Sequence, residues 1–376
     1  MKKKARVIAF YLPQYHPVPE NDKYWGKGFT EWTNVTKAKP LFKGHYQPKL
    51  PADLGFYDLR LPIVRDQQAE MAREAGVEGF MYWHYWFGNG KMVLQDIFEE
   101  VLKSGKPDFP FCLGWANHSW SNKTWTKGEK YQKDVEIFKQ TYPGEEDYIK
   151  HFNYCLSAFK DKRYITVDGK PLFVIWDAMA MPDVKEFISY WRCLANDAGL
   201  KGMHFTAIRY GSGTSIKELL NLGFDSVNNT NQYEAENKAL GSVIQKKIRS
   251  LFVRITNGEV ALRKYNYKNI IKYLSSIEDR QENVYPTLIS GYDRTARAGK
   301  KATIYYNYTP ELFDKYAKEI IDEVCEKEDE HKIIFLKSWN EWAEGNYMEP
   351  DSDWDSFFKA QNTALMKDKI GTLIWK

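Results

Sequence analysis

The sequence has few cysteines and no long apolar run. Its 376 residues contain four cysteines, which lie far apart without a C-x-x-C pair. This pattern suits a reducing compartment, because disulfide frameworks and zinc sites use closely spaced cysteines. No stretch is long and apolar enough to cross a bilayer, and the basic start is followed by too short an apolar run for a signal peptide. We therefore expect a cytoplasmic location and no transmembrane segment.

A dominant charge and several catalytic motifs are also missing. The net charge is +4, from 54 basic and 50 acidic residues, and no Lys/Arg stripe indicates a nucleic-acid partner. There is no H-E-x-x-H, G-x-S-x-G or Walker motif, so we expect no catalytic metal, no cofactor and no serine nucleophile. The Asp-Ser-Asp of residues 351–353 matches a short transferase motif but follows a turn. The Gly-Ser-Gly-Thr of residues 211–214 could hold a phosphate but is more typical of a plain loop.

Aromatic residues, in contrast, are abundant. They make up 16% of the chain, with 13 tryptophans and 25 tyrosines. Most of the tryptophans cluster at or just after the ends of expected strands: Trp25, Trp32, Trp83, Trp86, Trp115, Trp120, Trp125, Trp176, Trp339 and Trp342. Aromatic faces in such positions can stack on sugar rings or on bases, although a tryptophan-rich core would give the same composition.

Short apolar segments alternate with stretches of helical periodicity. The expected strands are residues 7–12, 79–85, 109–115, 172–177, 204–209, 224–228, 287–292 and 333–339. Helices are expected at residues 61–76, which end near Gly76, and after Thr309, which can cap a helix with Pro310 at its first position. About eight repeats predict an α/β fold of the (β/α)8 TIM-barrel type, in a single domain over residues 1–376. A doubly wound sheet is the alternative.

Two segments exceed what a minimal barrel needs. Residues 16–58 are rich in proline, glycine and aromatics, which favours an ordered loop after the first strand. Residues 234–282 are expected to form a helical insertion after the sixth strand, and residues 357–366 a final helix.

Polar residues follow most of the expected strands. Barrel enzymes build their sites at these carboxyl-terminal strand ends. The candidates chosen on this ground are Gln14, His16, His84, Asn117, His118, Tyr292, Asp293 and Arg297. Any one of them could also belong to a plain turn or to the core.

Two carboxylates follow the last strand in SWNEWAEGNYMEP. Glu341 and Glu344 can serve one site only if the chain leaves β geometry near Trp342, which Gly345 would ease. Two neighbouring carboxyls raise each other's pKa, and burial raises that of one further. One is then protonated and the other charged, as glycosidic cleavage needs. A surface turn with Glu344 as a helix cap is the alternative interpretation.

This motif resembles the catalytic motif of glycoside hydrolase family 99, the endo-α-mannosidases and endo-mannanases. The opening FYLPQYHPVPENDKYWGKGFTEW, with YWHYWF and WANHSW, is still more similar to the WbsX-type proteins, relatives of that family labelled glycosyltransferases of bacterial polysaccharide or O-antigen synthesis. The resemblance spans about residues 5–355. It implies a (β/α)8 barrel that retains anomeric configuration without a metal.

The resemblance also implies roles for individual residues. Glu341 would take the proton of the substrate's 2-hydroxyl, whose oxygen attacks the anomeric carbon and forms a 1,2-anhydro sugar. Glu344 would protonate the leaving oxygen and then activate water or another sugar. Asn340 would orient the pair. Position 343 is alanine where family 99 usually carries histidine, so mannose specificity and endo-cleavage stay open.

The remaining candidates are aromatic or acidic residues that could contact a glycan. They are Tyr11, Glu31, Trp32, Tyr82, Trp115 and Trp342. The expected partner is an oligo- or polysaccharide of the bacterial surface, such as an O-antigen, with a loose association to membrane-bound polysaccharide assembly machinery. Two alternatives stay open: a glycosyltransferase that uses an activated sugar donor, and a non-catalytic glycan-binding barrel.

Overall fold

The structure is a computed structural model that describes residues 5–121, 136–210, 213–241 and 263–352, with the single residues 247 and 251. In this part of the chain eight parallel strands form the barrel: β1 (Arg6–Tyr11), β2 (Gly79–His84), β3 (Phe111–Trp115), β7 (Lys170–Ile175), β8 (His204–Tyr210), β9 (Ser226–Thr230), β11 (Val284–Ile289) and β13 (Ile333–Lys337). They pair in the order β3-β2-β1-β13-β11-β9-β8-β7, and β7 pairs back onto β3. This closure confirms the (β/α)8 barrel and excludes the doubly wound sheet.

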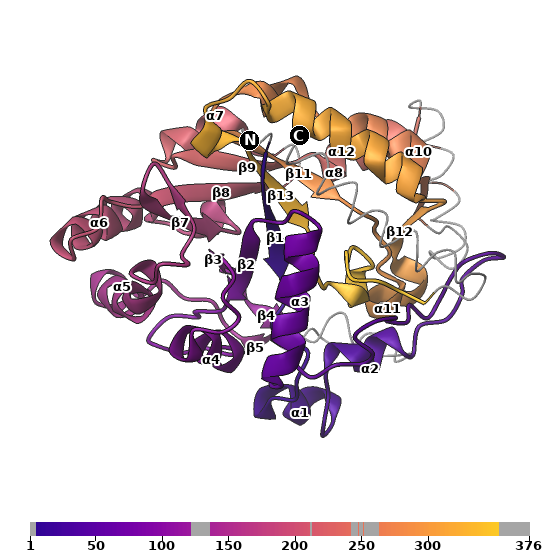
Figure 1. The fold of residues 1–376 in the computed structure, drawn as a ribbon, viewed down its shortest axis with the longest axis horizontal. Helices are drawn as coiled ribbons and strands as arrows, with labels where there is room; N and C mark the ends of the chain where they lie inside the picture. Colours follow the sequence, from indigo (N-terminus) through magenta and orange to yellow (C-terminus); the bar gives the residue numbers. More distant parts are fainter. Residues whose placement is uncertain are drawn as a thin grey trace.

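Helices lie around the outside of the strands (Figure 1). The larger ones are α3 (Pro62–Glu74), α4 (Asp96–Ser104), α5 (Glu145–Phe159), α6 (Val184–Asp197) and α12 (Pro310–Val324), with the shorter α7 (Ile216–Asn221) before β9. The start of α12 is as predicted: the Thr309 side chain accepts a hydrogen bond from the Leu312 amide, and Pro310 is the first residue. Its buried face covers the strands and excludes water from them.

Side chains of β1 and β2 alternate between the barrel interior and the surrounding helices. Phe10 and Trp83 point inward and contact each other, with ring centroids 5.2 Å apart. Tyr11 points outward, where its hydroxyl donates to Gln68 of α3 at 2.7 Å, and Tyr82 packs on Phe98 of α4. Two adjacent residues of a strand therefore face opposite sides, one toward the barrel interior and the other toward the surrounding helices.

The two long insertions take different forms. Residues 16–58 are ordered around α1 (Pro19–Trp25) and α2 (Glu31–Val35). Of residues 234–282, the described part contains α8 (Gln232–Ala239), β10 (Arg263–Asn266), α10 (Tyr267–Ile270) and the 3-10 turns η3 (Ile271–Tyr273) and η4 (Ile277–Arg280). Most of these elements are helical, as expected, but β10 is a strand that the sequence did not predict, and it pairs in parallel with β12 (Thr303–Tyr306). The expected helix at 357–366 lies outside the described residues.

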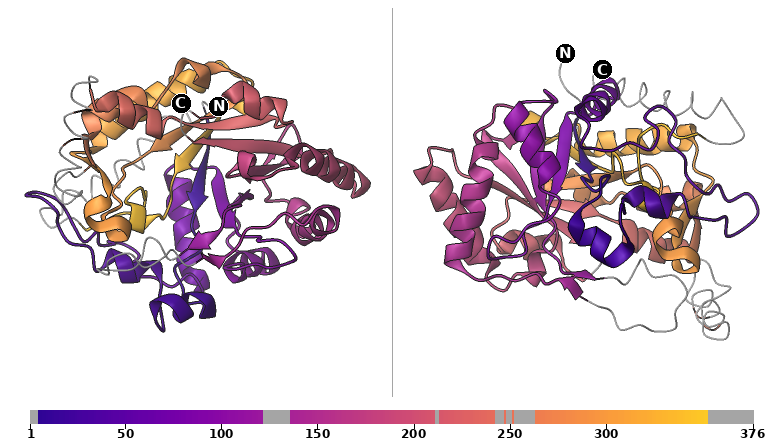
Figure 2. Two further views of the ribbon diagram at one scale, coloured as in Figure 1. Left: turned by 180° about the vertical axis from the view of Figure 1, so that it is seen from behind. Right: turned by 90° about the horizontal axis from the view of Figure 1, so that it is seen from below.

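One end of the barrel carries α2, α11 (Thr295–Ala298) and the 3-10 turn η7 (Trp342–Glu344), which are in mutual contact (Figure 2). These elements follow β1, β11 and β13 in the chain, so they lie at the carboxyl ends of those strands. None of the helices in the described ranges is long and apolar enough to cross a membrane.

Candidate active site

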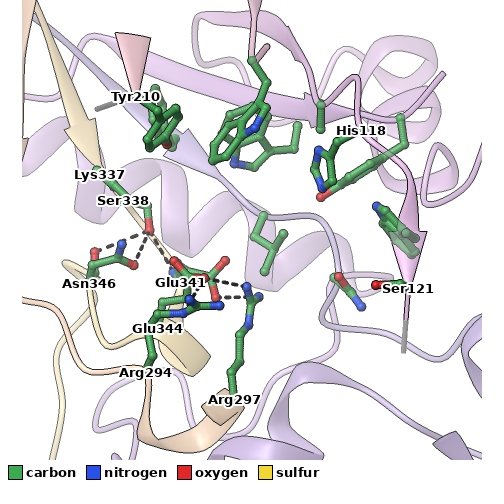
Figure 3. Close-up of a pocket in the computed structure, with 18 of the residues that line it drawn as sticks. His118, Ser121, Tyr210, Arg294, Arg297, Lys337, Ser338, Glu341, Glu344 and Asn346 are labelled. Carbon is green, nitrogen blue, oxygen red and sulfur yellow. Dashed lines mark hydrogen bonds and ion pairs between the residues drawn. The ribbon is translucent and has the colours of Figure 1, made fainter. Parts of the chain in front are cut away.

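A cavity of about 340 Å³ opens at the carboxyl ends of the barrel strands (Figure 3). Its wall is of three kinds. Carboxylates Glu341 and Glu344 follow β13, and cationic side chains come from the ends of β11 and β13. Aromatic rings from β1, β2 and β8 and from the loops after β3 and β7 complete it. The cavity combines carboxyls with stacking surfaces in the place where barrel enzymes work.

The glutamate pair lies on a tight turn directly after β13. Glu341 precedes the 3-10 turn η7, and Glu344 is its last residue, so the chain leaves β geometry near Trp342 as predicted. Gly345 then has φ +62, and a Cβ there would approach the Cβ of Asp293 to 2.9 Å. Glycine is required at this position both for the backbone angle and for the close approach.

One guanidinium joins three carboxylates, one fully buried and two largely buried. Arg297 of α11 donates from Nη2 to Glu341 Oε1 at 3.0 Å and from Nη1 to Glu344 Oε1 at 2.9 Å. The same Nη2 is 3.4 Å from Glu31 Oε1 of α2. Glu344 has a second cationic neighbour, because Arg294 Nε is 3.3 Å from its Oε1. The pair is therefore held from the segment that follows β11, with more positive charge around Glu344 than around Glu341.

This uneven distribution of charge shifts the pKa values of the two carboxyls in opposite directions. Burial raises the pKa of Glu341 to about 8, since the Glu344 and Glu31 charges add to burial and Arg297 offsets only part of it. Burial also acts to raise the pKa of Glu344, but Arg297, Arg294 and Lys337 outweigh it and hold that pKa below its ordinary value. In the free protein the proton therefore rests on Glu341, whereas the roles implied by the family-99 resemblance place it on Glu344.

An aromatic wall faces the charged residues across the cavity. Trp176, just after β7, has its ring centroid 5.3 Å from Trp83 and 4.3 Å from Tyr210, the last residue of β8. His118 lies 5.8 Å from Trp176. In Figure 3, Tyr210 and His118 lie on the other side of the cavity from Arg294 and Arg297. Such a wall suits the apolar face of a sugar ring.

The structure brings several predicted residues to the cavity. Gln14, His118, Arg297, Glu341 and Glu344 line it. Glu31 is linked to Glu341 and Glu344 through Arg297, and none of its side chain is exposed to solvent. Their part in binding a glycan stays a prediction.

Other predicted residues do not line the cavity and make contacts typical of the core. The Trp32 indole donates to the Tyr57 carbonyl oxygen at 2.8 Å. Trp342 donates to Glu349 at 2.6 Å and stacks on Tyr347. Tyr11 and Tyr82 pack outward against helices, as described above. These rings stabilise the walls of the site and are not available as stacking platforms in this structure.

Three further candidates fix the loops. Asn117 donates to the Asp177 carbonyl oxygen at 2.7 Å and accepts from the Asp177 amide at 2.8 Å. Asn340 pairs in the same way with the backbone of Leu12, at 2.8 and 3.0 Å, and does not contact either glutamate. The prediction that Asn340 orients the pair by hydrogen bonds is therefore wrong for this structure. It connects the end of β1 to the motif instead.

Asp293 connects the insertion after β1 to the end of β11. Its carboxylate accepts from His45 at 2.8 Å and Gln47 at 2.6 Å, and its amide donates to the Glu344 carbonyl oxygen at 2.7 Å. Burial acts to raise its pKa, but His45 and Lys49 outweigh burial and lower it. Asp293 thus positions the glutamate turn without lining the cavity. Its neighbour Tyr292 and the buried His16 do not line the cavity either.

The site candidates chosen from the sequence omit several residues that line the cavity. Trp83 lines the cavity, whereas its neighbours Tyr82 and His84 point away from it. Tyr210, Arg294 and Lys337 also line the cavity. Period-two alternation, applied from the inward-facing residue, would have found Trp83.

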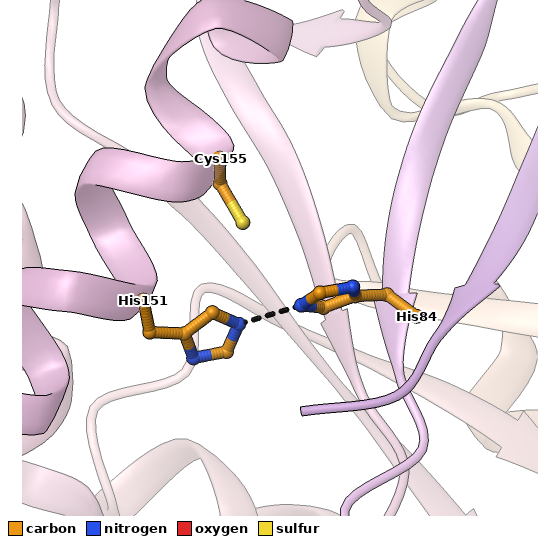
Figure 4. Close-up of side chains that lie close together, drawn as sticks. All are labelled: His84, His151 and Cys155. Carbon is orange, nitrogen blue, oxygen red and sulfur yellow. Dashed lines mark hydrogen bonds between the residues drawn. The ribbon is translucent and has the colours of Figure 1, made fainter. Parts of the chain in front are cut away.

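His84 belongs to a buried group with His151 and Cys155 of α5, whose possible ligand atoms lie within 4.8 Å of one another (Figure 4). The Nε2 atoms of His84 and His151 are 2.8 Å apart and share a direct hydrogen bond. Its proton occupies the position between the rings that a metal ion would need. His151 stacks on Trp86 at 4.5 Å, and Trp115 packs on it from the edge. Burial lowers the pKa of His84 to about 3, so both rings are neutral. We assign this group to the packed core.

Comparison with known proteins places this chain in a family. The chain matches the model described as Glycosyltransferase WbsX over residues 7–360. It is 32% identical over 349 residues to the uncharacterized protein WxcX of Xanthomonas campestris pv. campestris strain B100, a match that covers 93% of this chain and 48% of that protein. The chain thus spans about half the length of the curated relatives it matches.

Two solved structures share the fold. A glycoside hydrolase-like protein has a TM-score of 0.63 and 15% identity, covering 98% of this chain and 94% of that one. The GH99 endo-alpha-mannosidase from Bacteroides thetaiotaomicron, in complex with bis-tris-propane, has a TM-score of 0.56 and 14% identity, covering 99% of both chains. At these identities the likeness concerns the fold, whereas the family rests on the match along the sequence. The chain belongs to the family described as Glycosyltransferase WbsX.

Proposed function

We propose that this chain acts on glycosidic bonds of an oligo- or polysaccharide, with Glu341 and Glu344 as its catalytic pair. The observation that carries this proposal is a pair of largely buried carboxyls that share Arg297 at a cavity and have pKa values shifted in opposite directions. Such divergence is typical of an acid and base pair. A non-catalytic glycan-binding barrel would need the aromatic wall but not two buried carboxyls, whose desolvation is costly.

The reaction we propose retains anomeric configuration through the substrate's own 2-hydroxyl. Glu341 accepts the proton of that hydroxyl, its oxygen bonds to the anomeric carbon, and the bond to the leaving oxygen breaks as Glu344 protonates it. Water or a sugar hydroxyl then opens the 1,2-anhydro ring, giving its proton to Glu344 while Glu341 returns the first proton to the 2-oxygen. Because the proton rests on Glu341 in the free protein, substrate binding must first exchange the protonation states of the pair.

A glycosyltransferase with an activated sugar donor is the second candidate. The family description and the cationic side chains Arg294 and Lys337 at the cavity favour it. The two short motifs that could hold a phosphate or a metal fall partly outside the described residues, at positions 211, 212 and 353.

The test uses purified protein with a panel of α-linked bacterial oligosaccharides, with and without sugar nucleotides. Mass spectrometry follows the glycans and free nucleotide, and NMR follows the anomeric configuration of the first product. We expect shortened or rearranged glycans without any nucleotide. Nucleotide release coupled to a lengthened glycan would instead establish the transferase, and binding without any conversion would favour the glycan-binding barrel.

The cellular setting stays a prediction from the sequence. It comprises bacterial surface polysaccharide metabolism, a cytoplasmic location and a loose association with membrane-bound assembly machinery.

A further inference from the structure

Lys337 is a buried cation without a carboxylate partner. It is the last residue of β13, lines the cavity and is only 8% exposed. Its Nζ donates to the neutral Gln232 Oε1 at 3.0 Å. Nζ also lies over the rings of Tyr292, at 5.2 Å, and Tyr210, at 5.6 Å. Within the described part of the chain, Lys337 forms no ion pair.

This arrangement is costly in a protein without ligand. A buried ammonium loses its hydration and regains little of it from one amide oxygen and two aromatic rings. Burial lowers the pKa of Lys337, with a contribution from the Arg294 charge, and outweighs the negative charges of Glu344, Glu341 and Glu236. Arg297, in contrast, contacts three carboxylates through its two terminal nitrogens, and Arg294 contacts Glu344. Among the described cations that line the cavity, Lys337 is thus the one that contacts no carboxylate.

Its position determines which part of a ligand it would meet. Lys337 lies next to Tyr210, at one end of the aromatic wall, and next to Ser338, which precedes the glutamate turn (Figure 3). Ser338 Oγ accepts from the Glu341 amide at 3.1 Å. A sugar stacked on Trp176 and Tyr210 would therefore present one of its substituents to Lys337 while its anomeric carbon faces the glutamates.

We propose that the sugar bound in this cavity carries an anionic group, a carboxylate or a phosphate, that pairs with Lys337. The inference rests on the proposed function and adds the substrate class: an acidic sugar, or a sugar activated by a phosphate ester. Both sources supply the same chemistry, an anionic oxygen that can accept a charge-assisted hydrogen bond from an ammonium.

The pairing would also raise the proton affinity of Glu344, the group that protonates the leaving oxygen. Lys337 is one of three cations that keep Glu344 ionised in the free protein. An anion on Lys337 neutralises that charge and makes the surroundings of Glu344 less positive. Because Lys337 lowers the pKa of both glutamates in the free protein, the anion raises the proton affinity of Glu344 and, with it, that of Glu341.

The test measures binding to the full chain by isothermal titration calorimetry. The anionic probes are glucuronate, galacturonate, mannuronate, inorganic phosphate and UDP, and the neutral probes are glucose, galactose and mannose. They are compared on the unaltered protein, Lys337→Met, Lys337→Arg and the control Lys103→Gln, whose side chain is exposed on α4. Methionine keeps the length of lysine and removes an unpaired buried charge, so the variant should fold, and Lys337→Gln serves the same purpose if it does not.

We expect at least one anionic probe to bind about tenfold or more weakly to Lys337→Met, and to bind Lys337→Arg and Lys103→Gln much as it binds the unaltered protein. Neutral probes should not distinguish the variants. If the probe that responds is a uronate, the ligand is an acidic sugar. If it is phosphate or UDP, the ligand is an activated donor.

The proposal is wrong if no anionic probe binds the unaltered protein more tightly than Lys337→Met. This binding test requires no turnover, so its outcome is independent of the test of the proposed function. The anion proposal can fail while the oligosaccharide panel shows cleavage. The proposed function can fail while anion binding depends on Lys337.

Discussion

Replacing Glu341 by glutamine should stabilise the protein, and increasingly so as the pH rises. A carboxyl whose pKa is higher in the folded than in the unfolded chain costs stability once the pH exceeds its unfolded value. Below that value the group is protonated in both states and contributes nothing. Glutamine is neutral at every pH and keeps an oxygen that can accept from Arg297. The variant should therefore match the unaltered protein in acid and exceed it at alkaline pH.

The size of the effect follows from the shift. A rise from 4.5 to about 8, at about 1.4 kcal/mol for each pKa unit, corresponds to about 5 kcal/mol if Glu341 titrates alone. The gain will be smaller because Glu31 and Glu344 share the proton, so we expect about 2 to 4 kcal/mol at pH 8 and close to zero at pH 4. The gain should develop between about pH 4.5 and pH 8.

The measurement is urea unfolding followed by circular dichroism at pH 4, 6 and 8. Glu344→Gln is the matched control, because its effect should have the opposite sign. The folded pKa of Glu344 is lowered, so its charge contributes stability above the unfolded pKa, and that contribution is lost as the pH falls. The reasoning is refuted if Glu341→Gln is no more stable than the unaltered protein at pH 8, or if both variants shift in the same direction.

Three further predictions concern the walls of the site and its chemistry. Arg297→Met should lower the free energy of unfolding at pH 7 by about 3 to 5 kcal/mol, because it leaves buried carboxylates without their shared partner; a loss below about 1 kcal/mol in urea unfolding would contradict the cluster. Trp176→Ala should weaken glycan binding about tenfold with little change in stability, whereas Trp32→Ala should cost about 3 to 5 kcal/mol of stability through the core; the reverse pattern in calorimetry and thermal unfolding would mean that the stacking surface is misplaced. Turnover should be insensitive to EDTA, and a complete loss that Mn²⁺ restores would move the assignment to a metal-dependent transferase.

The fold could be predicted from the sequence because its signals are local. Each barrel strand is a short apolar run, and helix starts such as Thr309-Pro310 have their own capping chemistry. The pairing of β10 with β12 could not be predicted, since it joins residues far apart in the chain. The segment around β10 carries basic and aromatic residues without the alternation of a half-buried strand.

The site was predictable only in part, for two physical reasons. The glutamate motif can be recognised in the sequence, because two carboxylates and a glycine follow directly after an apolar strand. The direction of a strand's side chains, however, depends on the closure of the barrel, and an error of one residue selected Tyr82 and His84 in place of Trp83. The proton on Glu341 could not be foreseen either, because it depends on Arg294 approaching Glu344 from another loop.

The most direct test of the central claim is the turnover of Glu341→Gln and Glu344→Gln on any oligosaccharide that the unaltered protein converts. Glu74→Gln, an exposed change at the end of α3, is the control. We predict that each site variant loses about a hundredfold or more of the rate while folding normally, and that the control keeps its full rate. Undiminished turnover in either site variant would contradict the assignment of the pair.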